Sequence, residues 1–231
     1  MPFLRRAARP APPSAPLPPE DWRPQRFGRG ARAVPDPLIE PSWGGVRVIA
    51  RLARGRTRFV DEEGVDCTEE FATVAEAVSA GAQADELILD GFLTVEPTQA
   101  TAGVPLVGIE APSGGRLTTQ MLVGNRISRQ PEARRNLDPD RPIAFVAVDL
   151  LSIDGSILLD VPLLERKRLL GGALETGELV RITPFVRLPI GSFVSTWRGL
   201  GFAALAYKAA NSRYIPNGRN DDWSIAPMPL K

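Results

Sequence analysis

A nearly continuous apolar run at residues 143–151 constrains the fold of this 231-residue chain more than any other feature. A run of this length without polar alternation is typical of a strand that is buried on both faces. Asp154 and Gly155 follow shortly after it and favour a tight turn. We therefore expect the run to be the central strand of a sheet. No run of about 18 apolar residues occurs, so no membrane span is expected.

Shorter patterns predict further strands and helices around that central strand. Residues 46–52 alternate imperfectly between apolar and polar side chains, and an Arg-Gly-Arg turn separates them from a partner strand at 57–60. Residues 96–118 are rich in Gly, Pro, Thr and Ser and are expected to form a loop or a hairpin with an insertion. The other expected elements are strands at 86–95, 180–182 and 202–208, the last of them final, and helices at 71–80, 162–170 and 191–200. Gly171-Gly172 is expected to close the second helix. The pattern has no regular βαβ alternation and predicts an α+β domain with mostly antiparallel sheets flanked by helices.

The first 37 residues have a composition unlike the rest of the chain. They hold ten prolines and seven arginines against three acidic residues. Such a segment buries too little apolar surface to pack a core, so residues 1–37 are expected to be a flexible arm and residues 38–231 the folded domain. A basic arm that touches nucleic acid or a protein partner is the alternative interpretation.

The rare residue types exclude several kinds of chemistry. One cysteine, Cys67, excludes an internal disulfide and a cysteine-rich zinc site, and the lack of any histidine excludes imidazole bases. Lysine occurs only at Lys167, Lys208 and Lys231. The net charge of +1 argues against coating DNA by bulk electrostatics. No apolar stretch of signal-peptide length follows the basic N-terminus, so a cytoplasmic location is expected.

Four short motifs follow one another between residues 38 and 227. They are Glu40-Pro41-Ser42-Trp43-Gly44-Gly45-Val46-Arg47, Leu87-Ile88-Leu89-Asp90-Gly91-Phe92-Leu93, the segment 145–151 with Asp154-Gly155 and Pro162-Leu163-Leu164-Glu165-Arg166, and Tyr214, Pro216 and Gly218 with Asp222-Trp223. In this order and spacing they resemble the adenylation domain of ATP-dependent DNA ligases, especially the bacterial kind linked to end-joining repair. The resemblance implies a ligase-type nucleotidyltransferase fold, which is ATP-grasp-like.

The resemblance also implies a chemistry that this chain does not match. In the family a lysine amine attacks the α-phosphate of ATP, and the resulting AMP passes to the 5′-phosphate of a nick. The position that matches this lysine is Ser42. A serine hydroxyl needs a neighbouring base to become a nucleophile. We therefore predict no catalytic residue and interpret the chain as a pseudoenzyme.

Other working positions of the family are replaced as well. The replacing residues are Gly44 for the aspartate of the nucleophile motif, Phe92 and Ala203 for carboxylates that help to hold metal, Val148 for the aromatic residue that stacks on adenine, Glu62 for an arginine, and Ile225 and Pro227 for paired lysines. Magnesium prefers carboxylate oxygens, so no metal site is expected. ATP and magnesium are expected as cofactors only if the chain is an active ligase.

Several residues of the family pattern are retained, namely Glu40, Trp43, Gly45, Arg47, Asp90, Gly91, Lys208 and Trp223. Glu40, Arg47 and Lys208 resemble contacts of a nucleotide pocket, so they are the candidate residues of a residual pocket. The favoured alternative is structural, with Arg47 in a surface ion pair and Glu40 capping a loop. Lys208 would lie about a side chain's length from the nucleophile position, too far to replace it. Trp43 and Trp223 are expected in the core.

Three functions follow as hypotheses. The chain is a catalytically inactive ligase-like module that binds nicked or duplex DNA or a protein partner in a larger assembly, with the N-terminal arm as tether. Alternatively it is an active ATP-dependent DNA ligase or related nucleotidyltransferase in DNA repair, or a structural subunit of an unrelated assembly. The few residues after Trp223 leave no room for the OB-fold domain with which ligases close around DNA.

Overall fold

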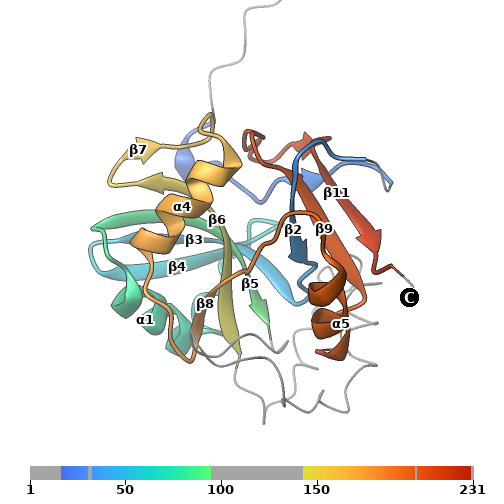
Figure 1. The fold of residues 1–231 in the computed structure, drawn as a ribbon. Coiled ribbons are helices and arrows are strands. Elements are labelled where there is room, and N and C mark those ends of the chain that lie inside the picture. Colours follow the sequence, from blue (N-terminus) through green and yellow to red (C-terminus); the bar gives the residue numbers. More distant parts are fainter. Residues whose placement is uncertain (1–16, 31–32, 95–142, 201, 230–231) are drawn as a thin grey trace, which may run out of the picture.

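The structure is a computed structural model that describes residues 17–30, 33–94, 143–200 and 202–229 (Figure 1). The described elements are η1 (Pro19–Asp21), β1 (Arg26–Phe27), β2 (Pro37–Pro41), β3 (Val46–Ala53), β4 (Arg56–Asp61), α1 (Ala72–Gly81), β5 (Glu86–Thr94), β6 (Ala144–Ile153), β7 (Ser156–Ile157), α4 (Leu163–Ala173), β8 (Val180–Ile182), α5 (Gly191–Gly199), β9 (Ala204–Ala209), β10 (Arg219–Asn220) and β11 (Trp223–Pro227). The expected loop at 96–118 lies outside the described residues.

The larger sheet has the strand order β4-β3-β5-β6-β7, with β8 also paired to β6. All its pairings are antiparallel except that of β6 with β8. Nine of the ten residues of β6 are buried, which confirms the apolar run as a central strand. Helices α1 and α4 contribute to the hydrophobic cluster on one face of this sheet, in front of it in Figure 1. The α+β class with mostly antiparallel sheets is confirmed.

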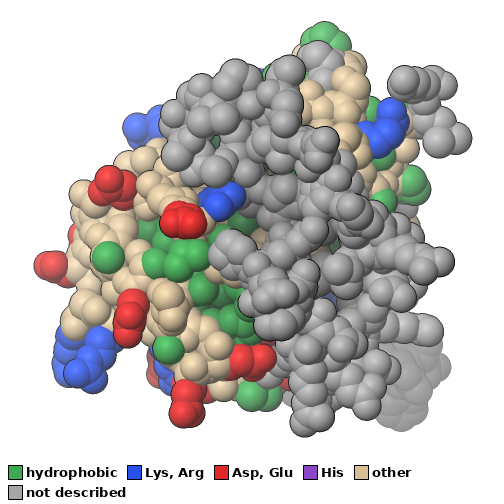
Figure 2. Space-filling model, turned by 90° about the horizontal axis from the view of Figure 1, so that it is seen from below, with side chains coloured by type: hydrophobic (Ala, Val, Ile, Leu, Met, Phe, Trp, Pro, Cys, Tyr) green, Lys and Arg blue, Asp and Glu red, His purple; other side chains and the backbone are tan. Residues whose placement is uncertain are grey.

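A three-stranded sheet, called the smaller sheet below, has the order β11-β9-β2 and is antiparallel throughout, and β1 and β10 form a separate parallel pair. Helix α5 lies beside the smaller sheet in Figure 1 and packs Val194 and Trp197 into a second hydrophobic cluster with Ile39 and Leu205. That cluster also contains Val148 of β6, so it joins the larger and the smaller sheet. In the coloured part of the face seen in Figure 2, hydrophobic side chains gather in one patch with acidic and basic side chains around it. Among the described residues, no helix has both the length and the apolar character to cross a membrane.

The turn after β6 has the geometry that its sequence favours. Asp154 and Gly155 have φ values of 45° and 76°, both in the left-handed region. A type I′ hairpin turn needs positive φ at both central residues, which Asp-Gly adopts at low cost. The tight turn predicted at this position is therefore confirmed.

Two expected boundaries are wrong. Helix α4 continues through Gly171 and Gly172 to Ala173, because Ala173 is buried in the core and the two exposed glycines face open space. The strand expected at 202–208 is β9, but it is not the final one. Both β10 and β11 follow, and β11 pairs with β9.

The expected limit of the N-terminal arm at residue 37 is also corrected. Trp22 is 1% exposed and Gln25 is fully buried, so residues 17–30 pack on the domain. The backbone N–H of Gln25 donates to Tyr214 Oη at 3.0 Å, and its side-chain oxygen accepts from the Ile215 N–H at 2.7 Å. One large aromatic residue and two long-range hydrogen bonds therefore outweigh the unfavourable local composition.

Gly91 marks a point where β5 and β6 approach closely. A Cβ atom at this position would lie 2.4 Å from Phe145 Cε2 and 2.6 Å from the Val146 carbonyl oxygen. We therefore expect Gly91→Ala to lower the free energy of unfolding by about 1–3 kcal/mol, as overpacking does. Gly171→Ala is the matched control, because open space surrounds it in α4 and alanine has the higher helix propensity, so stability is expected to rise by up to about 1 kcal/mol. Urea unfolding of both variants tests this, and equal stability of the two would contradict it.

Candidate nucleotide site

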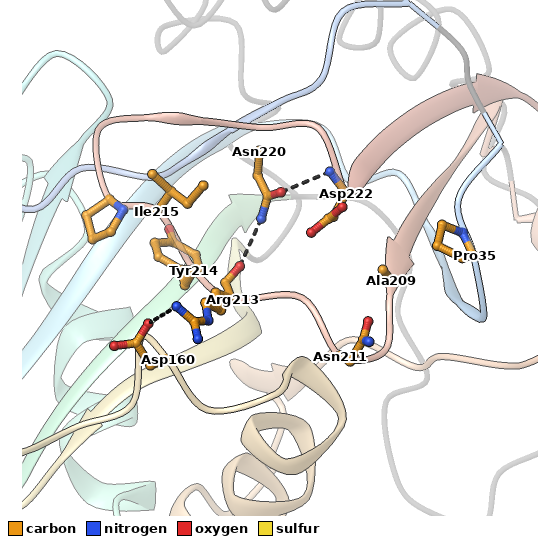
Figure 3. A pocket seen from close by; sticks show the side chains of 10 residues that line it. Pro35, Asp160, Ala209, Asn211, Arg213, Tyr214, Ile215, Asn220 and Asp222 are labelled. Carbon is orange, nitrogen blue, oxygen red and sulfur yellow. Dashed lines mark hydrogen bonds and ion pairs between the residues drawn. The ribbon is translucent and has the colours of Figure 1, made fainter.

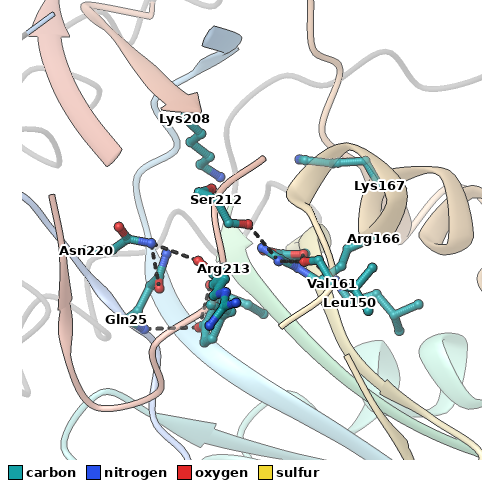
Figure 4. A network of polar contacts seen from close by, with 12 residues as sticks. Gln25, Leu150, Val161, Arg166, Lys167, Lys208, Ser212, Arg213 and Asn220 are labelled. Atoms are coloured by element: carbon teal, nitrogen blue, oxygen red, sulfur yellow. Dashed lines mark hydrogen bonds and ion pairs between the residues drawn. The ribbon is translucent and has the colours of Figure 1, made fainter. Parts of the chain in front are cut away.

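Two of the retained charged residues, Glu40 and Lys208, come together with Lys167 between the larger and the smaller sheet, whereas Arg47 lies in a separate ion pair. Lys208 pairs with Leu38 across β2 and β9, so Lys208 and Glu40 lie on the same face of the smaller sheet. Lys208 Nζ donates to Glu40 Oε2 at 2.8 Å, and Lys167 Nζ of α4 lies 2.5 Å from Glu40 Oε1. The second contact is an ion pair without hydrogen-bond geometry. Figure 4 shows the two lysines extending into the same space from different elements.

This cluster carries one excess positive charge in a buried place. The side chains of Glu40, Lys167 and Lys208 are 1%, 1% and 3% exposed. Burial lowers the pKa of Lys167 to about 8, because the attraction of Glu40 is opposed by the repulsion of Lys208. The Lys208 ammonium also lies 4.3 Å from the centre of the Trp223 ring, a favourable cation–π contact. Glu40 therefore neutralises lysines and does not cap a loop, so that structural interpretation was wrong.

The stability of the protein is expected to increase above about pH 8, where the folded chain releases the Lys167 proton. In the unfolded chain this amine ionises near its ordinary value of 10.5, so between the two values the unfolded state binds more protons. The penalty for burying the charged amine is therefore present below pH 8 and is relieved as the pH rises. The measurement is the urea midpoint at about pH 7 to 9.5 for the wild type and for Lys167→Met. The same pH slope in both proteins would rule out this role of Lys167.

Arg47 is held by Asp90 in a second buried ion pair. Its Nε and Nη2 atoms donate to the two carboxylate oxygens of Asp90 at 3.1 and 2.7 Å, and Nη1 donates to the Gln25 carbonyl at 2.7 Å. Burial opposes its charge, but Asp90 outweighs burial and raises the pKa of Arg47. The guanidinium carbon lies 5.7 Å from the Phe27 ring centre and 5.6 Å from that of Phe92. Arg47 is in an ion pair as expected, but a buried one.

Asp149 and Arg166 form a third buried pair. Arg166 Nε and Nη2 each donate to a carboxylate oxygen of Asp149 at 2.8 Å, and both side chains are 0% exposed. Arg166 Nη1 also donates to the backbone carbonyls of Val161 and Ser212. Figure 4 shows this arginine extending from α4 toward Ser212. The pair fixes α4 on the sheet.

Tyr214 connects this network to the N-terminal segment. Its hydroxyl donates to Asp90 Oδ2 at 2.9 Å and accepts from the Gln25 backbone N–H. Burial and the nearby Asp90 raise the pKa of Tyr214 well above its ordinary value, so the hydroxyl remains a donor at physiological pH. Both carboxylate oxygens of Asp90 therefore accept hydrogen bonds, one from Arg47 and the other from Arg47 and Tyr214.

Ser42 is buried at the end of β2, and its backbone N–H donates to the Ala204 carbonyl at 3.0 Å. Within the described residues, no carboxylate or amine forms a hydrogen bond with its hydroxyl. The adjacent Trp43 is 7% exposed, and its ring meets Phe202 edge-on at 4.9 Å between centres. Trp43 Nε1 donates to Thr183 Oγ1 at 2.8 Å. Trp43 and Trp223 are therefore core residues, as predicted.

The donor set does not fit magnesium. In the described part of the chain, no three Asp, Glu, Cys or His side chains come together as ligands. Each carboxylate between the sheets already binds cationic side chains, namely Glu40, Asp90 and Asp149. Val148, at the adenine-stacking position, packs in the same hydrophobic cluster as Trp43 and Phe202. The carboxylates of this layer are therefore paired with basic side chains of the same chain.

Sequence reasoning missed Lys167 and the partner of Arg166, although a signal for both exists. Leu163, Arg166, Lys167 and Leu170 have the i, i+3, i+4, i+7 spacing of one helix face, and all four are buried. Two basic residues on the apolar face of a helix need buried anions. Asp149, within an otherwise apolar strand, was the available partner for one of them.

Comparison with known proteins finds similar sequences and folds among DNA ligases. DNA ligase 1 of Korarchaeum cryptofilum is 27% identical over 190 residues, which make up 80% of this chain and 31% of that protein. The ligase domain of M. tuberculosis LigD has a TM-score of 0.63 and 21% identity over 91% of this chain and 61% of that one. A mycobacterial DNA ligase D in complex with ATP and MES has a TM-score of 0.61 and 22% identity over 90% of this chain and 60% of that one. No family model matches the chain.

The sequence is thus similar to that of a DNA ligase. More particularly, the chain shares its fold with the ligase D structures. It spans about a third of the curated relative and about 60% of the two solved structures.

Proposed function

We propose that this ligase-like domain has no adenylyl-transfer activity and serves as a binding module for DNA or for a protein partner. The observation that carries the proposal is that Ser42 stands where the family motif has its lysine, within a layer whose carboxylates are already paired with buried basic side chains. A nucleotide would have to break the Arg47–Asp90 pair or the Glu40 cluster to gain contacts there. Separating a buried ion pair costs about 3–5 kcal/mol, and this cost would reduce the free energy gained on binding a nucleotide.

The test of inactivity is incubation with ATP labelled on its α-phosphate, followed by denaturation and detection of label on the protein. No stable adenylate is expected, because a serine hydroxyl without a base is a poor nucleophile. An active ATP-dependent DNA ligase in the same assay is the positive control. A denaturation-stable adenylate on the wild-type chain would overturn the proposal.

A second candidate is an active nucleotidyltransferase that uses another lysine, and one observation favours it. Lys167 is an amine with a pKa of about 8 beside Glu40, so a larger share of it is deprotonated at neutral pH than of an ordinary lysine. If label appears, Lys167→Met and Lys208→Met decide where it sits. Loss of label in the first variant, with retention in the second, would establish Lys167 as the acceptor.

DNA is the first partner to test, since the relative is named a DNA ligase and the structural neighbours are ligase domains. The measurement is binding of the full chain to nicked and intact duplexes across a salt series. Phosphate contacts release counterions, so affinity is expected to fall as salt increases. An absence of affinity at low salt would remove DNA and leave a protein partner.

A further inference from the structure

An open cavity of about 720 Å³ has Tyr214 and its neighbours Arg213 and Ile215 in its wall (Figure 3). Its apolar wall includes Pro35, Ala209 and Ile215. Asp222 and Asn211 lie on one side of the view, and Asp160 lies on the other. The cavity therefore combines a hydrophobic surface with hydrogen-bonding and acidic groups, and such a mixture fits a ligand with both apolar and cationic parts.

The cavity carries an excess of negative charge. Asp160 is 3.3 Å from Arg213, and both side chains are mostly exposed, so this pair is weak and open to exchange. Asp222 makes no side-chain ion pair with any described residue. Two carboxylates therefore face one guanidinium, and the complementary ligand is cationic.

The edge of the cavity is fixed before any ligand arrives. Asn220 is buried, its Nδ2 donates to the Arg213 carbonyl at 2.8 Å, and its Oδ1 accepts from the Asp222 N–H at 2.9 Å. These two hydrogen bonds hold the backbone at Arg213 and the backbone at Asp222 to the same buried side-chain amide, that of Asn220. A preformed site avoids part of the ordering entropy of binding.

A segment of this chain has the matching chemistry. Residues 1–16 contain five prolines, the arginines Arg5, Arg6 and Arg9, and no acidic residue. Proline-rich segments favour an extended conformation and bind hydrophobic grooves with little loss of entropy. The segment thus offers apolar rings for the wall of the cavity and cations for its carboxylates.

The point where this segment joins the domain lies close to the cavity. Asn217 donates from Nδ2 to the Asp21 carbonyl at 3.0 Å, and its Oδ1 accepts from the Arg23 N–H at 2.7 Å. Asn217 belongs to the turn that begins at Ile215, a wall residue of the cavity. Sixteen residues at about 3.1 Å each span about 50 Å when extended, which is ample to reach it.

We propose that residues 1–16 dock into this cavity of their own chain, with arginines on Asp222 and Asp160 and prolines against the apolar wall. This interaction is separate from the layer between the sheets and does not depend on whether the domain transfers AMP. It gives the N-terminal segment a binding place within the molecule.

Limited trypsin digestion of the full chain tests the docking. Cleavage after Arg6 is expected to be about tenfold slower in the intact protein at low salt than in a synthetic peptide of residues 1–16, because a docked segment is cut mainly when it opens. Asp160→Asn with Asp222→Asn is expected to speed cleavage about threefold or more, since two charge contacts are lost. Asp85→Asn, at an exposed acid in the segment before β5, is the matched control and should leave the rate unchanged.

The remaining outcomes also decide the proposal. Equal cleavage rates in the intact protein and the peptide would overturn it, as would protection that is unaffected by the double substitution. If the protection disappears on dilution, the segment docks onto a second copy of the chain and the proposed docking within one molecule is wrong. Protection that appears only when duplex DNA is added would assign the segment to nucleic acid.

Discussion

Arg166→Met is expected to lower the free energy of unfolding by about 3–5 kcal/mol, because it leaves the buried carboxylate of Asp149 without its cation. Methionine keeps much of the side-chain volume, so the loss reports mainly on charge and hydrogen bonds. Both partners are 0% exposed, and Arg166 also satisfies two backbone carbonyls. The measurement is urea unfolding with an unchanged m-value.

Arg168→Ala provides the matched control on the same helix. Arg168 pairs with Glu165 at 2.8 Å, but the two side chains are 70% and 48% exposed. An exposed pair at this spacing contributes at most about 0.5 kcal/mol. A similar small loss for Arg166→Met would show that Asp149 finds solvent or another donor, and the proposed anchoring of α4 would be wrong.

The second large effect is expected for Glu40→Gln. The substitution keeps the shape of the side chain but leaves Lys167 and Lys208 buried together without an anion. We expect a loss of about 3–5 kcal/mol at neutral pH, as for other buried pairs from which one partner is removed. The loss is expected to shrink as the pH rises, because deprotonation of Lys167 relieves the repulsion.

A double variant distinguishes charge from packing at this position. Adding Lys167→Met to Glu40→Gln removes one of the two unneutralised cations and is expected to recover more than half of the lost stability. If the double variant is no more stable than Glu40→Gln alone, the ion pairs contribute little and the loss arises from packing.

Much of the fold follows from short-range patterns. The apolar run that became β6 and the Asp154-Gly155 turn both rest on preferences of neighbouring residues, so they could be predicted. The limits of α4 and of the N-terminal arm could not be predicted, because Ala173 and Trp22 are placed by packing against residues far away in the chain. Where a residue buries a large surface in the tertiary structure, that burial outweighs its local secondary-structure propensity.

The candidate site divides in the same way. The sequence by itself determined that a serine stands at the nucleophile position, that Glu40, Arg47 and Lys208 are retained, and that the motifs keep a ligase-like order. Only the tertiary structure decided what those charges bind. Glu40 and Lys208 are 168 residues apart and become partners because β2 and β9 pair. A buried charge needs an opposite charge beside it, and the fold determines which one lies nearest. No local pattern in the sequence specifies that partner.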